Sequence, residues 1–269
     1  MRRAVTSPTA SSPGPDAPDP LAEYARLLER AHADPAVVGV VVFGSRAVGA
    51  DLTPGSDVDC FVVVDGSDEE ARRWSTTYGA PVEVWPITLE AFRGHALAGD
   101  EAAWNRAAFI RARVDFDRLD GEVTAIVERK RRLTPDEAAA IVEADLDDAI
   151  NSIYRALKSA EAGRVREARL DAVEAIAPLL STVFALEARV RPFNRWLGRE
   201  LATPPLEMPA PADLLDRIDS LAVEATPEAI RSAFRMLEAA ARGAGYGAIV
   251  DAWEPYVGWL RDEAPYRKG

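Results

Sequence analysis

Two apolar runs separated by a turn-rich segment constrain this chain most. Residues 37–43 are Val-Val-Gly-Val-Val-Val-Phe, and residues 60–64 are Cys-Phe-Val-Val-Val. Short, continuous runs of β-branched residues are typical of strands buried on both faces of a sheet. We therefore expect a strand over 37–43, a break at Gly44, and a second strand that ends near residue 64.

Two aspartates open the second strand at alternate positions. Successive side chains of a strand point to opposite faces, so Asp57 and Asp59 share one face. Val58 and Cys60 then point the other way, into the core. Paired carboxylates form a hard oxygen site that suits Mg²⁺, which keeps water and phosphate oxygens among its ligands. We expect Asp57 and Asp59 to lie at a cleft, because a charge in so apolar a strand must be paired or solvated.

Gly44 and Ser45 follow the first apolar run directly. Because glycine has no side chain, backbone N–H groups here can approach a phosphate closely. A helix that begins near Ser45 would add positive potential at its amino end. Taken alone, each residue is better explained as a cap, Ser45 of a helix and Asp57 of the turn over 52–57.

A third acid lies on a short predicted strand further along the chain. Val82 and Val84 fall on one face of this strand, and Glu83 falls on the other. Together with Asp57 and Asp59, Glu83 has two candidate roles, as a metal ligand or as the general base that deprotonates an attacking hydroxyl. In isolation it is most simply an exposed strand residue, and the sequence leaves these readings open.

The order of these elements resembles the nucleotidyltransferase superfamily of the DNA polymerase β type. That family has a strand, Gly-Ser, a connection, Asp-x-Asp on a second strand, and a third carboxylate on another strand. The resemblance implies a small mixed sheet flanked by helices. It also implies transfer of a nucleoside monophosphate from a triphosphate to an acceptor, with release of pyrophosphate.

The resemblance implies a role for each site residue in turn. Gly44 and Ser45 hold the β and γ phosphates of the nucleotide. Asp57 and Asp59 bind the metal ions, expected to be Mg²⁺. Glu83 takes the position of the third carboxylate.

Basic residues in two segments are further candidates for binding the triphosphate. Arg46 follows Gly-Ser, as is common in small bacterial members of the family. Residues 152–197 resemble the helical domain of bacterial small-molecule nucleotidyltransferases, including relatives of aminoglycoside-modifying enzymes. In several relatives basic residues of that helix reach the triphosphate, which makes Lys158 and Arg155 candidates; otherwise both belong to a solvated helix face.

Changes in composition divide the 269 residues into three parts. Residues 1–20 are rich in Pro, Ser and Ala and are expected to form a disordered tail. Residues 21–133 carry the strand signals and form the expected nucleotidyltransferase domain. A capping box with proline at the first helical position opens residues 134–269, where strand signals vanish and an all-α bundle is expected. The predicted fold class is α+β.

Helical spacing of apolar residues predicts the remaining elements. In the first domain we expect helices at 21–32, 68–78, 88–97 and 100–110. In the second we expect a helix to about 162, another of similar length around 172–184, and shorter helices at 192–201, 211–222, 227–242 and 246–262. The segment after residue 110 predicts a last strand and turn. Its Asp115 and Asp117 have no preceding Gly-Ser, so we expect them to be structural.

Composition narrows the class of partner. A formal net charge of −12 and a pI near 4.8 argue against a general nucleic-acid binder and favour a cationic acceptor. The single cysteine, Cys60, cannot form an internal disulfide. No apolar run approaches the length of a membrane span, and the first residues lack the apolar centre of a signal peptide. We expect a cytoplasmic protein with no membrane partner and, since His32 and His95 lack neighbouring ligands, no zinc site.

Two acids interrupt the apolar stripes of the long helices in the second domain. Asp145 lies on the stripe of the first, and Glu187 lies on that of the second. Each has two readings, as a ligand for a cationic acceptor or as the partner of an Arg between helices. Arg191 and Asn194 are candidates to line the acceptor pocket.

These observations predict an Mg²⁺-dependent enzyme that transfers a nucleoside monophosphate to a hydroxyl of a small molecule. AMP from ATP is the first candidate for the group transferred. An aminoglycoside-like polycation is the candidate acceptor. One alternative is a protein adenylyltransferase of the toxin–antitoxin type, and another is a non-catalytic nucleotide-binding module. Intact Asp57, Asp59 and Glu83 argue against the second alternative. Base preference, acceptor identity and oligomeric state leave no signal in the sequence.

Overall fold

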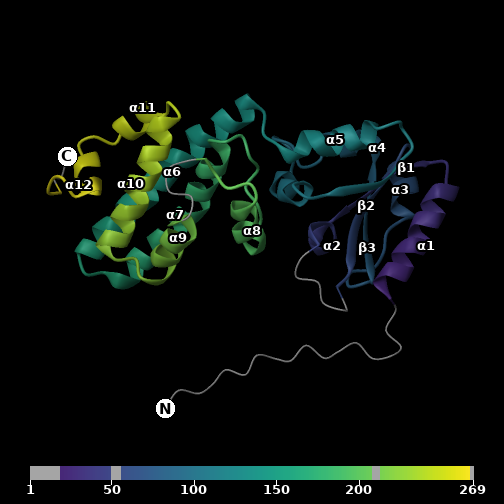
Figure 1. Cartoon of the computed structure of the whole chain (residues 1–269), viewed down its shortest axis with the longest axis horizontal. Coiled ribbons are helices and arrows are strands. Elements are labelled where there is room, and N and C mark those ends of the chain that lie inside the picture. The colour runs from purple at the N-terminus through teal and green to yellow at the C-terminus, as the bar shows by residue number, and fades with distance from the viewer. Residues whose placement is uncertain (1–18, 50–55, 208–212, 267–269) are drawn as a thin grey trace, which may run out of the picture. The chain divides into compact units, whose positions relative to one another are not determined.

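The computed structural model describes residues 19–49, 56–207 and 213–266 (Figure 1). The chain divides into two compact units, the first ending at Arg131 and the second beginning at Arg132. The described residues of the first unit hold a four-stranded sheet with flanking helices, and those of the second are mostly helical. The structure therefore confirms the predicted α+β class, with a small mixed sheet followed by a helical part.

Helix α1 spans Pro20–Ala33 and begins at the last residue of the expected tail. Asp19 caps it, because its Oδ1 accepts the N–H of Leu21 at 3.0 Å. Pro20 occupies the first turn, where a missing N–H has no cost. The remainder of the expected tail, residues 1–18, lies outside the described residues.

Four strands of the described chain form one mixed sheet in the order β3-β2-β1-β4. Strand β1 (Val37–Phe43) is antiparallel to β2 (Val58–Val64) and to β4 (Arg113–Asp117). Strands β2 and β3 (Val82–Thr88) are parallel. A parallel pair needs a crossover connection, which here contains α3 (Asp68–Arg72).

Helices cover both faces of this sheet (Figure 1). On one face, valines of β1 and β2 form a core with Tyr24 of α1 and Ala71 of α3. The other face is covered by α4 (Leu89–Gly94), the 3-10 helix η1 (Ala103–Phe109) and α5 (Glu122–Arg131). Strands β1 and β2 are thus buried on both sides, as their continuous apolar sequences predict, whereas β3 and β4 are partly exposed.

Gly39 allows α5 to approach β1 closely. A Cβ at position 39 would lie 2.8 Å from Cγ1 of Val123, a residue of α5 with no exposed surface. A glycine inside a strand commonly marks such an approach. No helix is expected at α5 from the sequence, because its apolar residues are few and packing against the sheet decides its conformation.

Lys130 of α5 fixes the end of α4. Its Nζ donates hydrogen bonds to the carbonyl oxygens of Phe92 at 2.7 Å and Arg93 at 3.2 Å. These carbonyl groups belong to the last turn of α4, where a carbonyl oxygen has no N–H group further along the helix to accept from. Burial lowers the pKa of Lys130 to about 8. The contact holds the chain in place just before His95.

Three helices of the first unit differ from expectation. Helix α3 ends at Arg72 rather than near residue 78, because the chain must turn back through Gly79 and Pro81 to begin β3. The segment expected to be α-helical at 100–110 forms the 3-10 helix η1. Helix α4 ends at Gly94, short of the expected residue 97.

The second unit is built on two long helices that pack along each other, α6 (Pro135–Glu161) and α7 (Val165–Ala185). The capping box between Thr134 and Glu137 starts α6 as predicted. The remaining helical elements are η2 (Asn194–Trp196), α8 (Leu197–Ala202), α9 (Leu214–Val223), α10 (Pro227–Gly243), α11 (Gly247–Asp251) and α12 (Val257–Arg261).

The helix expected at 246–262 is two short helices, α11 and α12. Pro255 lies between them, and a proline has no N–H to continue a helix. The helix expected at 211–222 is α9, and residues 211 and 212 lie outside the described chain. Of the helices that the structure describes, none combines the length and the apolar character needed to cross a membrane.

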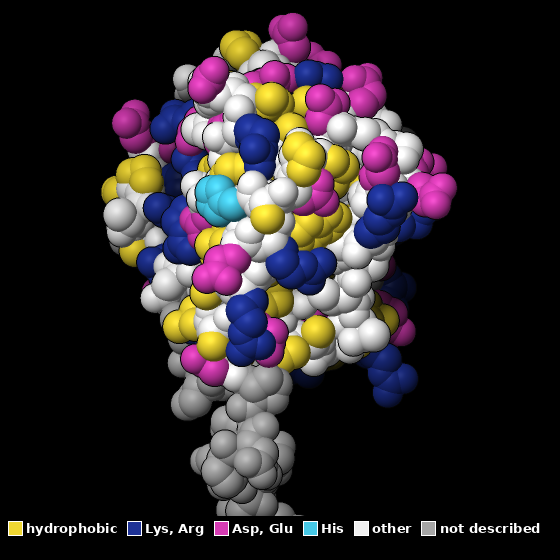
Figure 2. All heavy atoms as spheres, turned by 90° about the vertical axis from the view of Figure 1, so that its right-hand side faces the viewer, with side chains coloured by type: hydrophobic (Ala, Val, Ile, Leu, Met, Phe, Trp, Pro, Cys, Tyr) yellow, Lys and Arg dark blue, Asp and Glu magenta, His cyan; other side chains and the backbone are white. Residues whose placement is uncertain are grey.

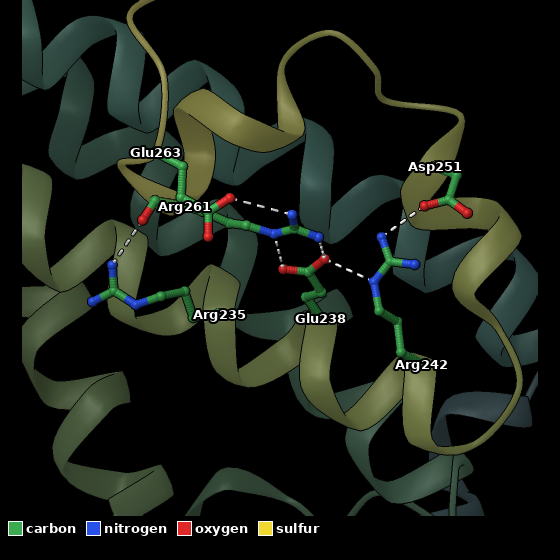
Figure 3. Close-up of polar contacts among 6 residues, drawn as sticks. All are labelled: Arg235, Glu238, Arg242, Asp251, Arg261 and Glu263. Atoms are coloured by element: carbon green, nitrogen blue, oxygen red, sulfur yellow. Dashed lines mark hydrogen bonds and ion pairs between the residues drawn. The ribbon is translucent and has the colours of Figure 1, made fainter.

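Glu238 joins α10 to α12 (Figure 3). Its carboxylate accepts hydrogen bonds from Nε of Arg242 at 2.8 Å and from Nε of Arg261 at 2.8 Å. Arg242 also donates to Asp251 of α11 at 2.7 Å. Burial alone raises the pKa of Glu238, but the bonds from Arg261 and Arg242 outweigh burial and hold it below its ordinary value.

Gly39→Ala should destabilise the first unit by about 1–3 kcal/mol, because the added methyl group overlaps Val123. Val123→Ala makes room for that methyl group while losing its own buried contacts. We expect the double variant to be less destabilised than the sum of the two single variants, as measured by urea denaturation. Strict additivity would show that the two positions do not compete for space.

Glu238→Gln should lower the free energy of unfolding by about 1.5–3 kcal/mol at neutral pH, the range for hydrogen bonds to charged groups. The matched control is Glu263→Gln, since Glu263 pairs with the same Arg261 at 3.4 Å but is 65% exposed. A lowered pKa stabilises the fold above the unfolded value of about 4.3, and this stabilisation is lost as the pH falls through the folded pKa. The difference between wild type and Glu238→Gln should therefore narrow on acidification; equal effects of the two substitutions would contradict this account.

Candidate active site

Three carboxylates converge at one end of the sheet. Asp57 immediately precedes β2, Asp59 is its second residue, and Glu83 is the second residue of β3. One oxygen atom from each side chain lies within 4.8 Å of the other two, and all three residues are partly exposed. The structure thus brings together the three acids that the sequence singles out.

Strand pairing causes this convergence. Strands β2 and β3 are in parallel register with Asp59 opposite Glu83, so both side chains leave the same face of the sheet. The N–H of Val58 donates to the carbonyl oxygen of Pro81 at 3.0 Å, which fixes the register at its first residues. Asp57 lies two residues before Asp59 and faces the same way.

The loop between α3 and β3 orients Glu83. The N–H of Gly79 donates to Oε1 of Glu83 at 2.6 Å. The same loop covers part of the outer edge of β3, where Oγ1 of Thr76 accepts the N–H of Val84 at 2.8 Å. Pro86, two residues further along that edge, has no N–H to offer.

Gly44 ends β1 and begins the short helix α2 (Gly44–Val48). Phe43 pairs with Asp59 across the sheet, so Gly44 lies directly beside that carboxylate. Gly44 has φ of +69°, and a Cβ here would overlap Oδ2 of Asp59. Ser45 is buried inside α2 rather than capping it, which removes the capping alternative for Ser45. Only glycine fits this turn while Asp59 keeps its position.

Arg46 contacts the chain just before the aspartates. Its Nε and Nη2 donate to the carbonyl oxygen of Ser56 at 3.2 and 2.7 Å. This contact ties α2 to the start of β2 across residues 50–55, which lie outside the described chain. Phosphate binding by Arg46 stays a prediction.

Lys158 and Arg155 belong to α6 in the second unit. Nη2 of Arg155 forms an ion pair with Glu174 of α7 at 2.5 Å. Nζ of Lys158 lies 5.7 Å from the ring centroids of both Tyr154 and Tyr266, at cation–π distance. Contact of either residue with a triphosphate stays a prediction.

The two acids of the long-helix stripes have different surroundings. Oε1 of Glu187 accepts the N–H of Glu207 at 2.6 Å. Burial raises the pKa of Asp145, against a hydrogen bond from Ser181 that lowers it. Asp145 and Arg155 line a cavity of about 380 Å³ along α6 and α7. The acceptor role considered for Asp145 and Glu187 stays a prediction.

Asp115 and Asp117 of β4 form contacts within the fold. Asp115 accepts hydrogen bonds from Oη of Tyr24 at 2.8 Å and from Nε of Arg113 at 2.5 Å. Asp117 accepts bonds from the N–H of Thr124 at 2.9 Å and from its hydroxyl at 2.8 Å. Both aspartates therefore stabilise the end of the sheet around β4, α1 and α5.

A cavity of about 460 Å³ adjoins Glu83 along β3. Trp85 and Ile87 line it, and they follow Glu83 at alternate positions of the strand, so all three share one face. Phe61 of β2 and His95, which follows α4, also line the cavity. Sequence reasoning missed Trp85, although its spacing of two residues from Glu83 is the signal that places it beside the acids.

The rings around this cavity differ in exposure. Trp85 is 40% exposed, whereas Phe61 is buried at 1%. The Trp85 ring packs edge-on against Phe43 at 6.0 Å and Phe61 at 6.2 Å between centroids. Burial lowers the pKa of His95, against an opposing effect of Asp100, which favours the neutral imidazole.

Comparison with known proteins extends this picture. The family model of the nucleotidyltransferase domain matches residues 24–130. Comparison with curated proteins gives no match. Among solved structures, the chain is similar to the nucleotidyltransferase-like protein from Exiguobacterium sibiricum 255-15, with a TM-score of 0.44 and 16% identity, covering 86% of this chain and 78% of that chain.

The matched residues run from α1 to α5, and so contain the whole sheet with Gly44, Asp57, Asp59 and Glu83. The chain therefore contains a nucleotidyltransferase domain, which spans residues 24–130.

Proposed function

We propose that this nucleotidyltransferase transfers a nucleoside monophosphate, AMP from ATP, to a hydroxyl group of a small molecule. The observation that supports the proposal is the convergence of Asp57, Asp59 and Glu83 within 4.8 Å, beside the turn at Gly44. In the transfer, the acceptor oxygen bonds to the α phosphorus, the bond from that phosphorus to the β-phosphate bridging oxygen breaks, and pyrophosphate leaves. The hydroxyl proton passes to Glu83 or to water.

The donor set fits a divalent cation. Each of the three side chains offers a carboxylate oxygen, and oxygen ligands from one or two acids, completed by phosphate and water, are those that Mg²⁺ prefers. We propose that Asp57 and Asp59 hold Mg²⁺ here, with Glu83 as a third ligand or as the base. A bound cation would neutralise charge on the triphosphate and make its α phosphorus a better electrophile.

The chain's own groups would position the nucleotide around this site. Gly44 and Ser45 would bind the β and γ phosphates through backbone N–H groups at the start of α2, while the missing side chain at Gly44 leaves the space that the Asp59 carboxylate fills. Arg46, which follows Ser45, is one basic candidate, and Lys158 of the helical unit is a second. The hydrogen bond from Gly79 would keep one oxygen of Glu83 directed within the site.

The acceptor is proposed to be a small molecule rather than a nucleic acid. On the face drawn in Figure 2, Lys and Arg side chains are interspersed with Asp and Glu instead of forming one basic area. A net charge of −12 would draw a cationic acceptor, such as an aminoglycoside-like compound, toward the protein. The cytoplasm, which supplies nucleoside triphosphates and keeps the buried Cys60 thiol reduced, is the proposed location.

Asp57→Asn and Asp59→Asn should each lower the rate of pyrophosphate release by more than about 100-fold, because charge neutralisation by a held cation is worth several kcal/mol. The measurement is pyrophosphate release from each of the four nucleotides against a panel of acceptors. Asp65→Asn is the matched control, since Asp65 is exposed and follows the far end of β2. Retained turnover in both site variants would refute the mechanism.

The same assay separates the two roles of Glu83. Glu83→Gln keeps an oxygen ligand but cannot accept a proton. If Glu83 is the base, the rate of the variant falls, and the rate no longer increases with pH on the acidic side of the pH–rate profile. If Glu83 is a ligand, the variant instead needs more Mg²⁺ for half-maximal rate.

Gly44→Ala should lower kcat/KM by more than about tenfold, because the new methyl group displaces the Asp59 carboxylate from the site. Gly49→Ala is the matched control: Gly49 has a similar φ of +66°, but no atom of the residues that the structure describes lies within 4 Å of an added Cβ. Both variants carry the strain of a left-handed backbone, about 1–2 kcal/mol. Equal losses of activity in both would assign the effect to backbone strain alone.

A further inference from the structure

We propose that the cavity beside Glu83 binds an uncharged planar ring of the acceptor, stacked on the indole of Trp85. The inference rests on the proposed function, because that function assigns Glu83 to the reacting centre. It adds a chemical class of acceptor, one whose reacting hydroxyl is attached to an aromatic or similarly flat ring or lies next to it. The rings of an aminoglycoside are saturated, so on this inference the acceptor shares only cationic groups with such compounds.

The order of strands places this cavity on the acceptor side of the site. Gly44 follows β1, Asp59 lies in β2 and Glu83 lies in β3, and these three strands are consecutive across the sheet. The cavity lies along β3, the strand of this sheet that is farthest from β1 on the side of β2, so Glu83 lies between the cavity and Gly44. A nucleotide with its phosphates at Gly44 therefore leaves the cavity to the other substrate.

The lining favours a flat apolar group. Trp85 is 40% exposed and follows Glu83 by two residues on the same strand face, so a ring stacked on its indole is close to the carboxylates. Ile87 continues that apolar face away from the acids. Among the described residues that line the cavity, none is Lys or Arg, so nothing there would pair with a phosphate or a carboxylate.

The rings of this lining do not form a cage of the kind that recognises a quaternary ammonium group. Such a cage uses the open faces of several rings, although a single ring face can also attract a cation. Here Phe61 is 1% exposed and packs its ring against Phe109, while Tyr78 is 98% exposed and projects from the loop. Trp85 is thus the accessible ring that packing against Phe43 and Phe61 holds in place, which suits stacking. Amino groups of a cationic acceptor would lie outside the cavity.

The polar groups of the cavity suit an uncharged ring with a polar substituent. The hydroxyl groups of Thr76 and Thr77 and the imidazole of His95 line it. His95 is held between Asp100, with Nδ1 to Oδ2 at 3.6 Å, and Asn105, with Nε2 to Nδ2 at 3.5 Å. The threonine hydroxyl groups can exchange hydrogen bonds with a hydroxyl or carbonyl on the ring without adding charge, while both ring nitrogens of His95 already have partners in the protein.

Three probes of similar size test the proposal on the full-length protein with Mg²⁺ present. Benzyl alcohol has a planar ring and a hydroxymethyl group, cyclohexylmethanol has the same group on a saturated ring, and cyclohexylmethylamine carries an ammonium. Ligand-observed NMR titration gives the affinity of each. We expect benzyl alcohol to bind at least about fivefold more tightly than the other two, as expected for stacking on one aromatic side chain.

Substitutions at Trp85 then test whether benzyl alcohol binds in this cavity. Trp85→Ala should weaken benzyl alcohol binding by about fivefold or more, and Trp85→Phe should retain most of it. Trp104→Ala is the control, since Trp104 is a 65% exposed tryptophan of η1 outside the cavity. The affinity for ATP should be the same in wild type and Trp85→Ala.

Four results would overturn the proposal: equal binding of the planar and saturated alcohols, tightest binding of the amine, no effect of Trp85→Ala, or a matching loss of ATP affinity. The last would assign the ring to the nucleobase. Asp57→Asn separates this inference from the proposed function, because it should lose pyrophosphate release and keep benzyl alcohol binding. Ring binding by a protein that never releases pyrophosphate would count against the proposed function alone.

Discussion

The parallel pairing of β2 with β3 is the constraint on which the site depends. It sets Asp59 opposite Glu83, and the antiparallel pairing of β1 with β2 sets Gly44 beside Asp59. A slip of one residue would turn Glu83 toward the core shared with α1 and separate it from Asp59. Burial of apolar strand residues on both faces of the sheet resists that slip. The packing of valines thus positions three partly exposed carboxylates.

Features written in local sequence were predictable, and features set by tertiary packing were not. The strands, the Asp57–Asp59 alternation and the capping box at Thr134 follow from short patterns, and the structure has all of them. The pairing partner of Asp59 has no local signature, because register is decided between strands. Helix α5 was not predicted because it has no strong apolar stripe. Its conformation depends instead on contact with the sheet at Gly39.

The overall charge and the local lining describe different stages of recognition. A net charge of −12 acts at long range and influences which molecules approach. The groups beside Glu83 act at contact distance, and there the principal surface is the indole of Trp85 with Ile87 beyond it. The net charge can be read from the sequence, and it predicts a cationic acceptor. The lining of the cavity could not be read from the sequence, because it depends on where the α3–β3 loop and His95 lie.

Strand β3 carries both Glu83 and Trp85 at the open edge of the sheet. Uncovered edges with unpaired N–H groups tend to recruit strands from other chains, which leads to aggregation. In this edge the N–H of Val84 is already bonded to Thr76, and Pro86 has none. The backbone around the site therefore offers few donors to a foreign strand. A binding surface can stay accessible to small solutes here without making the protein adhere to copies of itself.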